Sequence, residues 1–297
     1  MRDTRQFLTS IGLPDGDAYN LPTSEKRFAD GGQYRFEVPG IQGPKVMEAL
    51  LEAMDKHGIH LHRITQTKGI MMLLDNEIIE MVRLAKEAQT DLILAIGPRA
   101  TTDTSASVNT PEGVRMGYRL RGQEQIVRAI EDVKRAVSFG CSSFLVYDEG
   151  LLWLLNEMRK AGEISADCHF KVSAHMGHGN PCSAKLLEMI GANSVNPVRD
   201  IQLPMLAAMR QAIDIPIDIH TENPASTGGF IRHYEVPGMV RVASPIYLKT
   251  GGSVAKTHSW DSTTDDAKKR AKQVALVKRM LDAYYPAAVQ SPKGMTK

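Results

Sequence analysis

The chain alternates short β-type runs with helical patterns, and this alternation constrains its fold more than any other feature. The first run is Tyr34–Val38, and the helical pattern over Lys45–His57 that follows it ends at Gly58. The eighth run is Ile246–Lys249, followed by a last helical stretch near Asp265–Ala283. Alternating strands and helices form a parallel sheet through right-handed crossovers, and eight such strands close a barrel. The sequence therefore predicts a single (β/α)8 TIM barrel.

The predicted domain organisation is an N-terminal extension, residues 1–33, followed by one barrel, residues 34–297. A barrel of this kind needs roughly 250 residues, which the chain provides. A doubly wound open sheet is the alternative, but the GxGxxG turn of its nucleotide-binding members is absent. The other β-type runs lie at Ile59–Thr65, Leu92–Ile96, Phe144–Tyr147, Phe170–Ala174, Ser194–Val198 and Pro216–Thr221. The long connections Gly97–Gly122, Glu222–Arg241 and Thr250–Thr264 all follow strands, on the face where barrel enzymes keep their active sites.

Charge and cysteine content narrow the partners and the compartment. The net charge of +2 comes from mixed signs, which argues against a nucleic-acid partner. The sequence shows neither a signal peptide nor a run long enough to cross a bilayer, so no membrane partner is expected. Cys141, Cys168 and Cys182 form no CxxC pair, which argues against a disulfide framework. We expect a cytoplasmic protein that forms a homo-oligomer.

Strand alternation predicts which side chains face the barrel axis, because successive residues point to opposite faces. If the apolar residues Ile217 and Ile219 face the helices, then Asp218, His220 and Glu222 face inward. The same reasoning gives three further inward sets, which are Lys171, Ser173 and His175, then Arg35 and Glu37, then His60 and His62. Charges buried in this way must be paired, metal-bound or wetted, so we expect Asp218 to pair with Lys171 or Arg35.

A divalent metal site is one hypothesis for the strand ends. His175, His220, Glu222 and Glu149 offer mixed nitrogen and oxygen ligands suited to zinc, manganese or iron, although these groups could instead bind one another and substrate. The His60-Leu61-His62 spacing is similar to the HxH of amidohydrolase barrels, but the last strand offers Lys249 where those enzymes have aspartate. No nucleotide cofactor motif is present.

Glycine pairs after the last two strands predict an anion site. Loops at these positions commonly bind phosphate in barrel enzymes through their backbone N–H groups, and a carboxylate would bind in the same way. Arginine and lysine nearby could add charge-assisted hydrogen bonds. The candidate residues are Gly228, Gly229, Gly251, Gly252, Arg232, Arg99 and Lys249. Lys171 or Lys249 could also form a Schiff base if burial lowered its pKa.

Two stretches, HRITQTKGIMMLLDNEIIEMVRLAKEA and LVYDEGLLWLLNEMRKAGEI, resemble bacterial barrels of the U32 peptidase family. The YEVPGMVRVASPIYLK segment extends the resemblance over roughly residues 34–250. The resemblance implies the barrel fold and the site positions His62, Arg63, Asp148, Glu149, Glu222 and Arg232. The cysteine signature of the collagenase-like members is absent, so peptide cleavage does not follow from it.

The combined prediction is a lyase or isomerase that acts on a small oxygenated anion, such as a keto acid, sugar acid or sugar phosphate. Glu149, Glu222 or a histidine such as His62 would move a proton beside a carbonyl, and Lys171 or a metal would stabilise the resulting charge. A metal-dependent hydrolase and a non-catalytic ligand-binding barrel are the alternatives.

Overall fold

The computed structural model describes residues 2–16, 20–97, 119–255 and 262–294. Its strands form one closed barrel in sequence order, with every neighbouring pair parallel and β8 paired with β1. This confirms the predicted fold class. The strands are β1 Tyr34–Pro39, β2 Arg63–Gln66, β3 Asp91–Ala95, β4 Ser143–Val146, β5 His169–Val172, β6 Ser194–Val195, β7 Ile217–His220 and β8 Ile246–Lys249.

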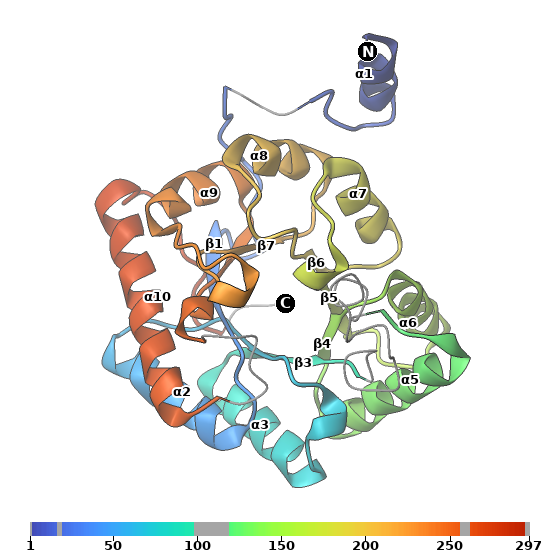
Figure 1. The fold of residues 1–297 in the computed structure, drawn as a ribbon, viewed down its shortest axis with the longest axis vertical. Coiled ribbons are helices and arrows are strands. Elements are labelled where there is room, and N and C mark those ends of the chain that lie inside the picture. Colours follow the sequence, from blue (N-terminus) through green and yellow to red (C-terminus); the bar gives the residue numbers. More distant parts are fainter. Residues whose placement is uncertain (1, 17–19, 98–118, 256–261, 295–297) are drawn as a thin grey trace.

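Helices surround the barrel as an outer ring, whereas α1 stands apart at the edge of the molecule (Figure 1). The α-helices are α1 Arg2–Ser10, α2 Pro44–Lys56, α3 Asp75–Ala88, α5 Gly122–Ser138, α6 Glu149–Ala161, α7 Pro181–Met189, α8 Leu203–Ala212, α9 Val236–Ala243 and α10 Thr264–Tyr284. Short 3-10 turns are η1 Ile70–Met72, η3 Ala174–Met176, η4 Ala225–Thr227, η5 His233–Glu235 and η6 Gly252–Val254. In the described residues no helix has the length and apolar character needed to cross a bilayer.

The connection Glu222–Arg241, predicted as one long loop, contains most of the helix α9, which ends at Ala243. The sequence signal is weak because α9 has eight residues and includes Pro237 and Gly238. Proline is tolerated in the first turn of a helix, where its missing N–H has no partner to lose.

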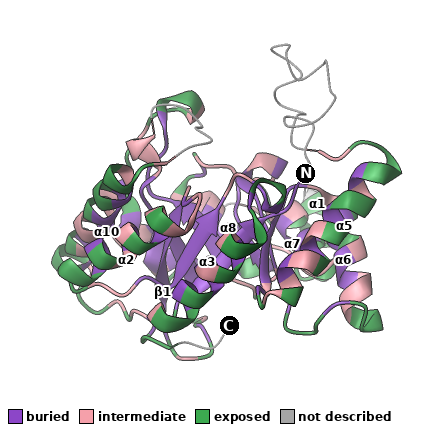
Figure 2. Ribbon diagram, turned by 90° about the horizontal axis from the view of Figure 1, so that it is seen from below, coloured by how far each residue is buried: buried purple, intermediate pink, exposed green. Residues whose placement is uncertain are grey.

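Two apolar clusters separate along β3 and β4 according to strand alternation. Leu92, Leu94 and Phe144 belong to the large cluster between the strands and the helices. Ile93, Ala95, Leu145 and Tyr147 form a second, small cluster, and their alternation with the first set places them on the inner face. Figure 2 shows the strands in purple, as buried, at the centre of the molecule, with mixed buried and exposed residues along the surrounding helices. One side of the barrel interior is therefore apolar, and the charged residues come from the other strands.

The segment before β1 and the segment after α10 both contact the barrel floor. Phe28 packs edge-on against Tyr247, with the two ring centres 5.3 Å apart, and the Arg35 guanidinium lies 3.9 Å from the centre of the Phe28 ring. Asp30 pairs with Arg35 at 2.8 Å, and Arg35 Nε donates to the Ser291 hydroxyl. These contacts satisfy Arg35, which is 2% exposed, and they close the end of the barrel opposite the candidate site.

Candidate functional site

A group of buried charges fills the middle of the barrel. Lys171 pairs closely with Glu37 and lies 3.2 Å from Asp218, while Arg63 lies 2.9 Å from Asp218 and 3.3 Å from Asp91. Burial by itself would raise the pKa of Glu37, but Lys171, and after it Lys249 and Arg63, outweigh that effect and hold the pKa at about 2. The sequence prediction that Asp218 pairs with Lys171 is confirmed by the 3.2 Å contact.

Lys249 lies above this group, at the carboxyl end of β8. Its Nζ donates to Asn196 Oδ1 at 3.2 Å and lies 3.7 Å from the Glu37 carboxylate. Burial lowers the pKa of Lys249, and the Lys171 ammonium lowers it further. Glu37 and Asp218 offset these effects only in part, so the pKa is about 7. Lys249 is thus partly uncharged near neutral pH, which gives it a free electron pair for chemistry.

His220 and Asn223 present buried polar atoms without partners. Both ring nitrogens of His220 and both amide atoms of Asn223 have no hydrogen-bond partner among the described residues. Burial, and after it the Lys249 charge, lowers the pKa of His220 well below its ordinary value, so the imidazole is neutral. Unsatisfied buried polar groups cost free energy, so these atoms are suited to a polar ligand or ordered water.

Arg199 and Arg270 bring positive charge to the same pocket from outside the strands. The Arg199 guanidinium donates to His175 Nε2 at 2.9 Å, and because a guanidinium can only donate, that nitrogen carries no proton. Arg270, on α10, donates to the backbone carbonyls of Pro39 and Gly251 at 2.9 and 2.8 Å. Arg270 thereby joins the loops after β1 and β8.

These side chains line one pocket at the carboxyl ends of the strands. Lys249, Arg199 and Arg270 supply its cations, and no Asp or Glu is among the described residues that line it. Leu145 and Tyr147, from the inner apolar cluster, form another part of the wall. A pocket with this charge and this apolar wall is suited to a small organic anion.

The four predicted metal ligands do not converge. His175 and His220 line the pocket, but the Glu222 carboxylate accepts from Gly251 N and from Ser253 Oγ at 2.7 Å. Glu222 is past the end of β7 and completely buried, so strand alternation does not govern its direction. It ties the β7 loop to the β8 loop at the rim of the barrel, and it is not among the described residues that line the pocket.

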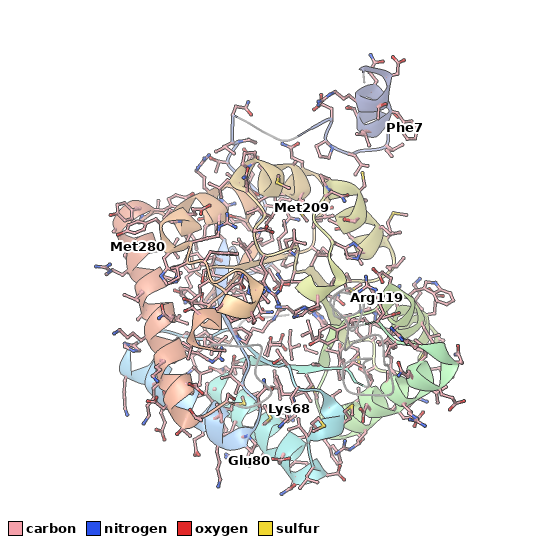
Figure 3. All side chains as sticks on the ribbon, viewed as in Figure 1. Phe7, Lys68, Glu80, Arg119, Met209 and Met280 are labelled. Atoms are coloured by element: carbon pink, nitrogen blue, oxygen red, sulfur yellow. The ribbon has the colours of Figure 1, made fainter. Side chains whose placement is uncertain are left out.

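Glu149 lies away from the pocket lining, in the first turn of α6. It accepts hydrogen bonds from Arg119 at 2.9 Å and pairs with His178 at 2.8 Å, and Figure 3 labels Arg119 near α6. Asp148 caps the same helix by accepting from Leu151 N. Across the described part of the chain, no group of three His, Cys, Asp or Glu residues is placed to hold a metal ion. The donor set therefore does not fit the predicted metal, and we derive no reaction step through one.

His62 does not face the barrel axis, which corrects the predicted orientation of strand two. β2 begins at Arg63, and Arg63 and Thr65 reach Asp218 and Glu37 inside the barrel. His62 Nδ1 accepts from Phe36 N, and its Nε2 donates to the Ser291 carbonyl at the floor. Burial lowers the pKa of His62 to about 3. Residues 59–62 are not part of the strand, so regular alternation does not extend from Arg63 back to His62.

The predicted anion-binding residues separate into two groups. Lys249 and Gly252 line the pocket, and Gly251 packs against Arg270, where an added Cβ would lie 2.9 Å from the Arg270 side chain. Arg232 is held by Glu235 at 2.7 Å and by the Ile201 carbonyl, and neither it nor Gly228 and Gly229 is among the lining residues. Arg99 lies outside the described residues, as do residues 98–118 of its loop.

Sequence reasoning missed Arg199, Asn223 and Arg270. Arg199 and Asn223 follow the short strands β6 and β7 by a few residues, a position where polar residues of a barrel deserve a functional hypothesis. Arg270 gave no such signal, because a single arginine on a charged helix is typical of a solvent-exposed face.

Comparisons with known proteins agree on the fold. No protein-family model matches the chain, and no curated protein matches its sequence. A solved structure described as native KDPGal is 10% identical, with a TM-score of 0.50 over 88% of this chain and 98% of that one. A U32 peptidase is 15% identical, with a TM-score of 0.41 over 69% of this chain and 74% of that one.

A truncated 3-deoxy-D-arabino-heptulosonate 7-phosphate synthase from Thermotoga maritima is 12% identical, with a TM-score of 0.48 over 88% of this chain and 90% of that one. At such identities the likeness defines the class, a (β/α)8 barrel, and no more. The resemblance to U32 peptidases is accordingly one of fold, and it carries no site residue over to this chain.

Proposed function

We propose that the protein is a lyase or isomerase that acts on a small oxygenated anion by moving a proton on the carbon beside a carbonyl group. The observation that carries the proposal is the pocket lining, which combines Lys249, Arg199 and Arg270 with the neutral His220 imidazole and no described carboxylate. Removing a proton beside a carbonyl builds negative charge on oxygen, and preorganised cations and hydrogen-bond donors stabilise that charge.

The pocket residues have separate roles in this proposed reaction. Arg199 and Arg270 would bind the anionic group of the substrate, and the unpartnered Asn223 amide would donate to the carbonyl oxygen. The neutral His220 imidazole or the neutral Lys249 amine would accept the proton, because each holds an electron pair near neutral pH. Of the predicted catalytic residues, Lys171 supports the site from below through Glu37 and Asp218.

Hydrogen exchange tests the proposal directly. Small keto acids and sugar phosphates are incubated with the protein in D2O, and the signal of the protons beside the carbonyl is followed by NMR. We expect at least one anionic carbonyl compound to lose that signal faster with the protein than without it. We also expect Arg199→Ala to slow the loss and Cys182→Ser, at an exposed cysteine on α7, to leave it unchanged.

Binding in the same samples separates the alternatives. Ligands that raise the melting temperature but exchange no proton would contradict the enzyme proposal and favour a ligand-binding barrel. The metal-dependent hydrolase has no support in the arrangement of metal donors among the described residues.

A further inference from the structure

The barrel interior holds two lysines whose surroundings differ. Lys171 is held between two carboxylates, Glu37 and Asp218, and is therefore fixed as a charged ion-pair partner. Among the residues that the structure describes, Lys249 has a hydrogen bond only to the neutral Asn196 amide, and its carboxylate contact, with Glu37, is 3.7 Å long. Lys249 also lines the pocket, whereas Lys171 does not. Lys171 therefore supports the site through its ion pairs, and Lys249 is the lysine that is available for reaction.

We propose that Lys249 Nζ forms an imine with the carbonyl carbon of a 2-oxo acid substrate. The inference rests on the proposed function and names the catalytic nucleophile and the substrate class for that same pocket. It assigns to Lys249 the Schiff-base chemistry that the sequence left open between two lysines. Lys171 then acts as a positioning residue, because its charge adds to burial in lowering the pKa of the neighbouring Lys249 amine.

The reaction balances without an oxidant or a metal. The neutral amine adds to the carbonyl carbon, and the carbinolamine loses the carbonyl oxygen as water, which leaves a C=N bond. Protonation of that nitrogen gives an iminium. The iminium accepts the electron pair of the adjacent C–H bond while the neutral His220 imidazole takes the proton, and an enamine results. Protonation of the enamine carbon and hydrolysis of the imine return the free amine.

A 2-oxo acid fits because cations line the same pocket as the amine. Arg199, Arg270, Lys249 and His220 all line this pocket, and the Arg199 charge acts on both Lys249 and His220. A carboxylate bonded to the carbonyl carbon puts the negative charge one bond from the reacting atom, within reach of a cation beside the amine. The apolar wall of Leu145 and Tyr147 is suited to the short carbon chain of such a substrate.

Borohydride trapping with pyruvate is the test. Reduction converts an imine into a stable secondary amine, and mass spectrometry of the intact protein and of its peptides locates the added group. We expect one reduced pyruvyl group per chain, on Lys249, and none on Lys171. Acetone, which lacks the carboxylate, should label at least about tenfold less at equal concentration if a cation binds the anion, the equivalent of 1.4 kcal/mol.

Lys249→Arg keeps an N–H donor for Asn196 but cannot form the imine. We expect this variant to remain folded, to bind pyruvate and to give no adduct. Since trapping on the unaltered protein maps the site by itself, an unfolded variant would not prevent the test. Label spread over surface lysines, or equal label in Lys249→Arg, would overturn the proposal.

The pH profile provides a second measurement. The ionisable groups that act on the pKa of Lys249 include Glu37, Lys171, Arg199 and Asp218, and the neutral His220 lines the same pocket. With a Lys249 pKa of about 7, the trapping rate should fall about tenfold per pH unit below that value and level off above it. A rate that keeps rising to pH 10 indicates an ordinary surface lysine and contradicts the proposal.

The trapping experiment and the proton-exchange experiment test different claims, so one can fail while the other succeeds. Exchange without an adduct overturns the imine and leaves the proposed function standing, with His220 as the proton acceptor. An adduct on Lys249 without exchange supports the imine and contradicts proton transfer as the overall function. Loss of both contradicts both.

Discussion

At the scale of single residues, Glu37 determines how the interior charges coexist. Its carboxylate contacts Lys171, lies 3.8 Å from Arg63 and 3.7 Å from Lys249, and accepts from the Thr65 hydroxyl at 2.9 Å. Removing one partner of a buried ion group leaves charges without compensation in a medium that solvates them poorly. One carboxylate therefore balances cations that come from three other strands.

We predict that Glu37→Gln lowers the free energy of unfolding by about 3–5 kcal/mol at pH 7, the usual cost of breaking a buried ion pair. Urea unfolding measures this loss, and Glu157→Gln is the control, because Glu157 pairs with Lys160 on an exposed face of α6. The control should keep the wild-type midpoint. Equal effects of the two substitutions would show that the buried ion group contributes no more to the free energy of unfolding than an exposed ion pair does.

The free energies of unfolding of the wild type and of Glu37→Gln should approach each other at acidic pH. The folded-state pKa of Glu37 is about 2 and its ordinary value is 4.5, so its ionisation stabilises the fold above pH 4.5. This contribution is lost as the pH falls from 4.5 towards 2, because the unfolded chain binds the proton first. Urea unfolding at several pH values between 7 and 3 should show the wild type losing its advantage over Glu37→Gln. A constant difference would contradict the lowered pKa.

At the scale of elements, three loops are joined around the pocket. Glu222 connects the β7 loop to Gly251 and Ser253 of the β8 loop, and Arg270 connects Gly251 to Pro39 after β1. Gly251 has a φ of +99°, where side chains are rarely accommodated, and its α-carbon faces the Arg270 side chain. Loop geometry at this position thus sets the place of a pocket cation.

Gly251→Ala should therefore weaken pyruvate binding by about tenfold, or about 1.4 kcal/mol, since the new Cβ would lie 2.9 Å from Arg270 Cβ and Cγ. Calorimetric titration gives the affinity. Gly162→Ala is the matched control, because Gly162 has a φ of +76° with nothing within 4 Å of the added atom. It carries the backbone strain without displacing a pocket residue, so its affinity should equal that of the wild type. If Gly251→Ala binds pyruvate with normal affinity, the position of Arg270 does not matter for anion binding.

At the scale of the whole molecule, the barrel has a closed floor and a polar mouth. The floor is built by segments outside the strands, with Phe28 on Arg35 and Tyr247, and with Ser291 on Arg35 and His62. The mouth collects Lys249, His220 and the loop arginines. Binding and reaction are therefore expected from one end, while the other end contributes stability.

We predict that Phe28→Ala lowers the free energy of unfolding by about 3–5 kcal/mol, as expected for a buried phenylalanine, while the pyruvate affinity of the folded protein stays normal. Phe28 is 7% exposed and Phe7, labelled on the outlying helix α1 in Figure 3, is 62% exposed. Phe7→Ala should thus leave the urea midpoint unchanged. If Phe28→Ala unfolds at the wild-type midpoint, the segment before β1 has no part in closing the floor.

The eightfold alternation of strands and helices determined the barrel, because each period is local to its own segment and needs no tertiary information. Within β1, β5 and β7, the same locality placed Glu37, Lys171 and Asp218 inside the barrel, where Lys171 contacts both carboxylates.

The direction of side chains beyond the strand ends was decided only by the tertiary structure. β2 begins at Arg63 and β7 ends at His220, so His62 and Glu222 lie beyond the strands, where strand alternation does not determine their direction. Where a strand begins and ends depends on its pairing with neighbouring strands, which the sequence of one segment does not show. Likewise, Arg199 and Arg270 reach the pocket from a loop and an outer helix.

The chemistry of Lys249 was also decided in three dimensions. The sequence supplied a lysine at the end of the last strand, and any lysine in water holds its proton up to a pKa of about 10.4. Only the closed barrel buries it and brings Lys171 from β5 near its amine, which lowers the pKa to about 7. Burial and the electrostatic field of distant residues are properties of the folded chain, so no local pattern in the sequence could have shown them.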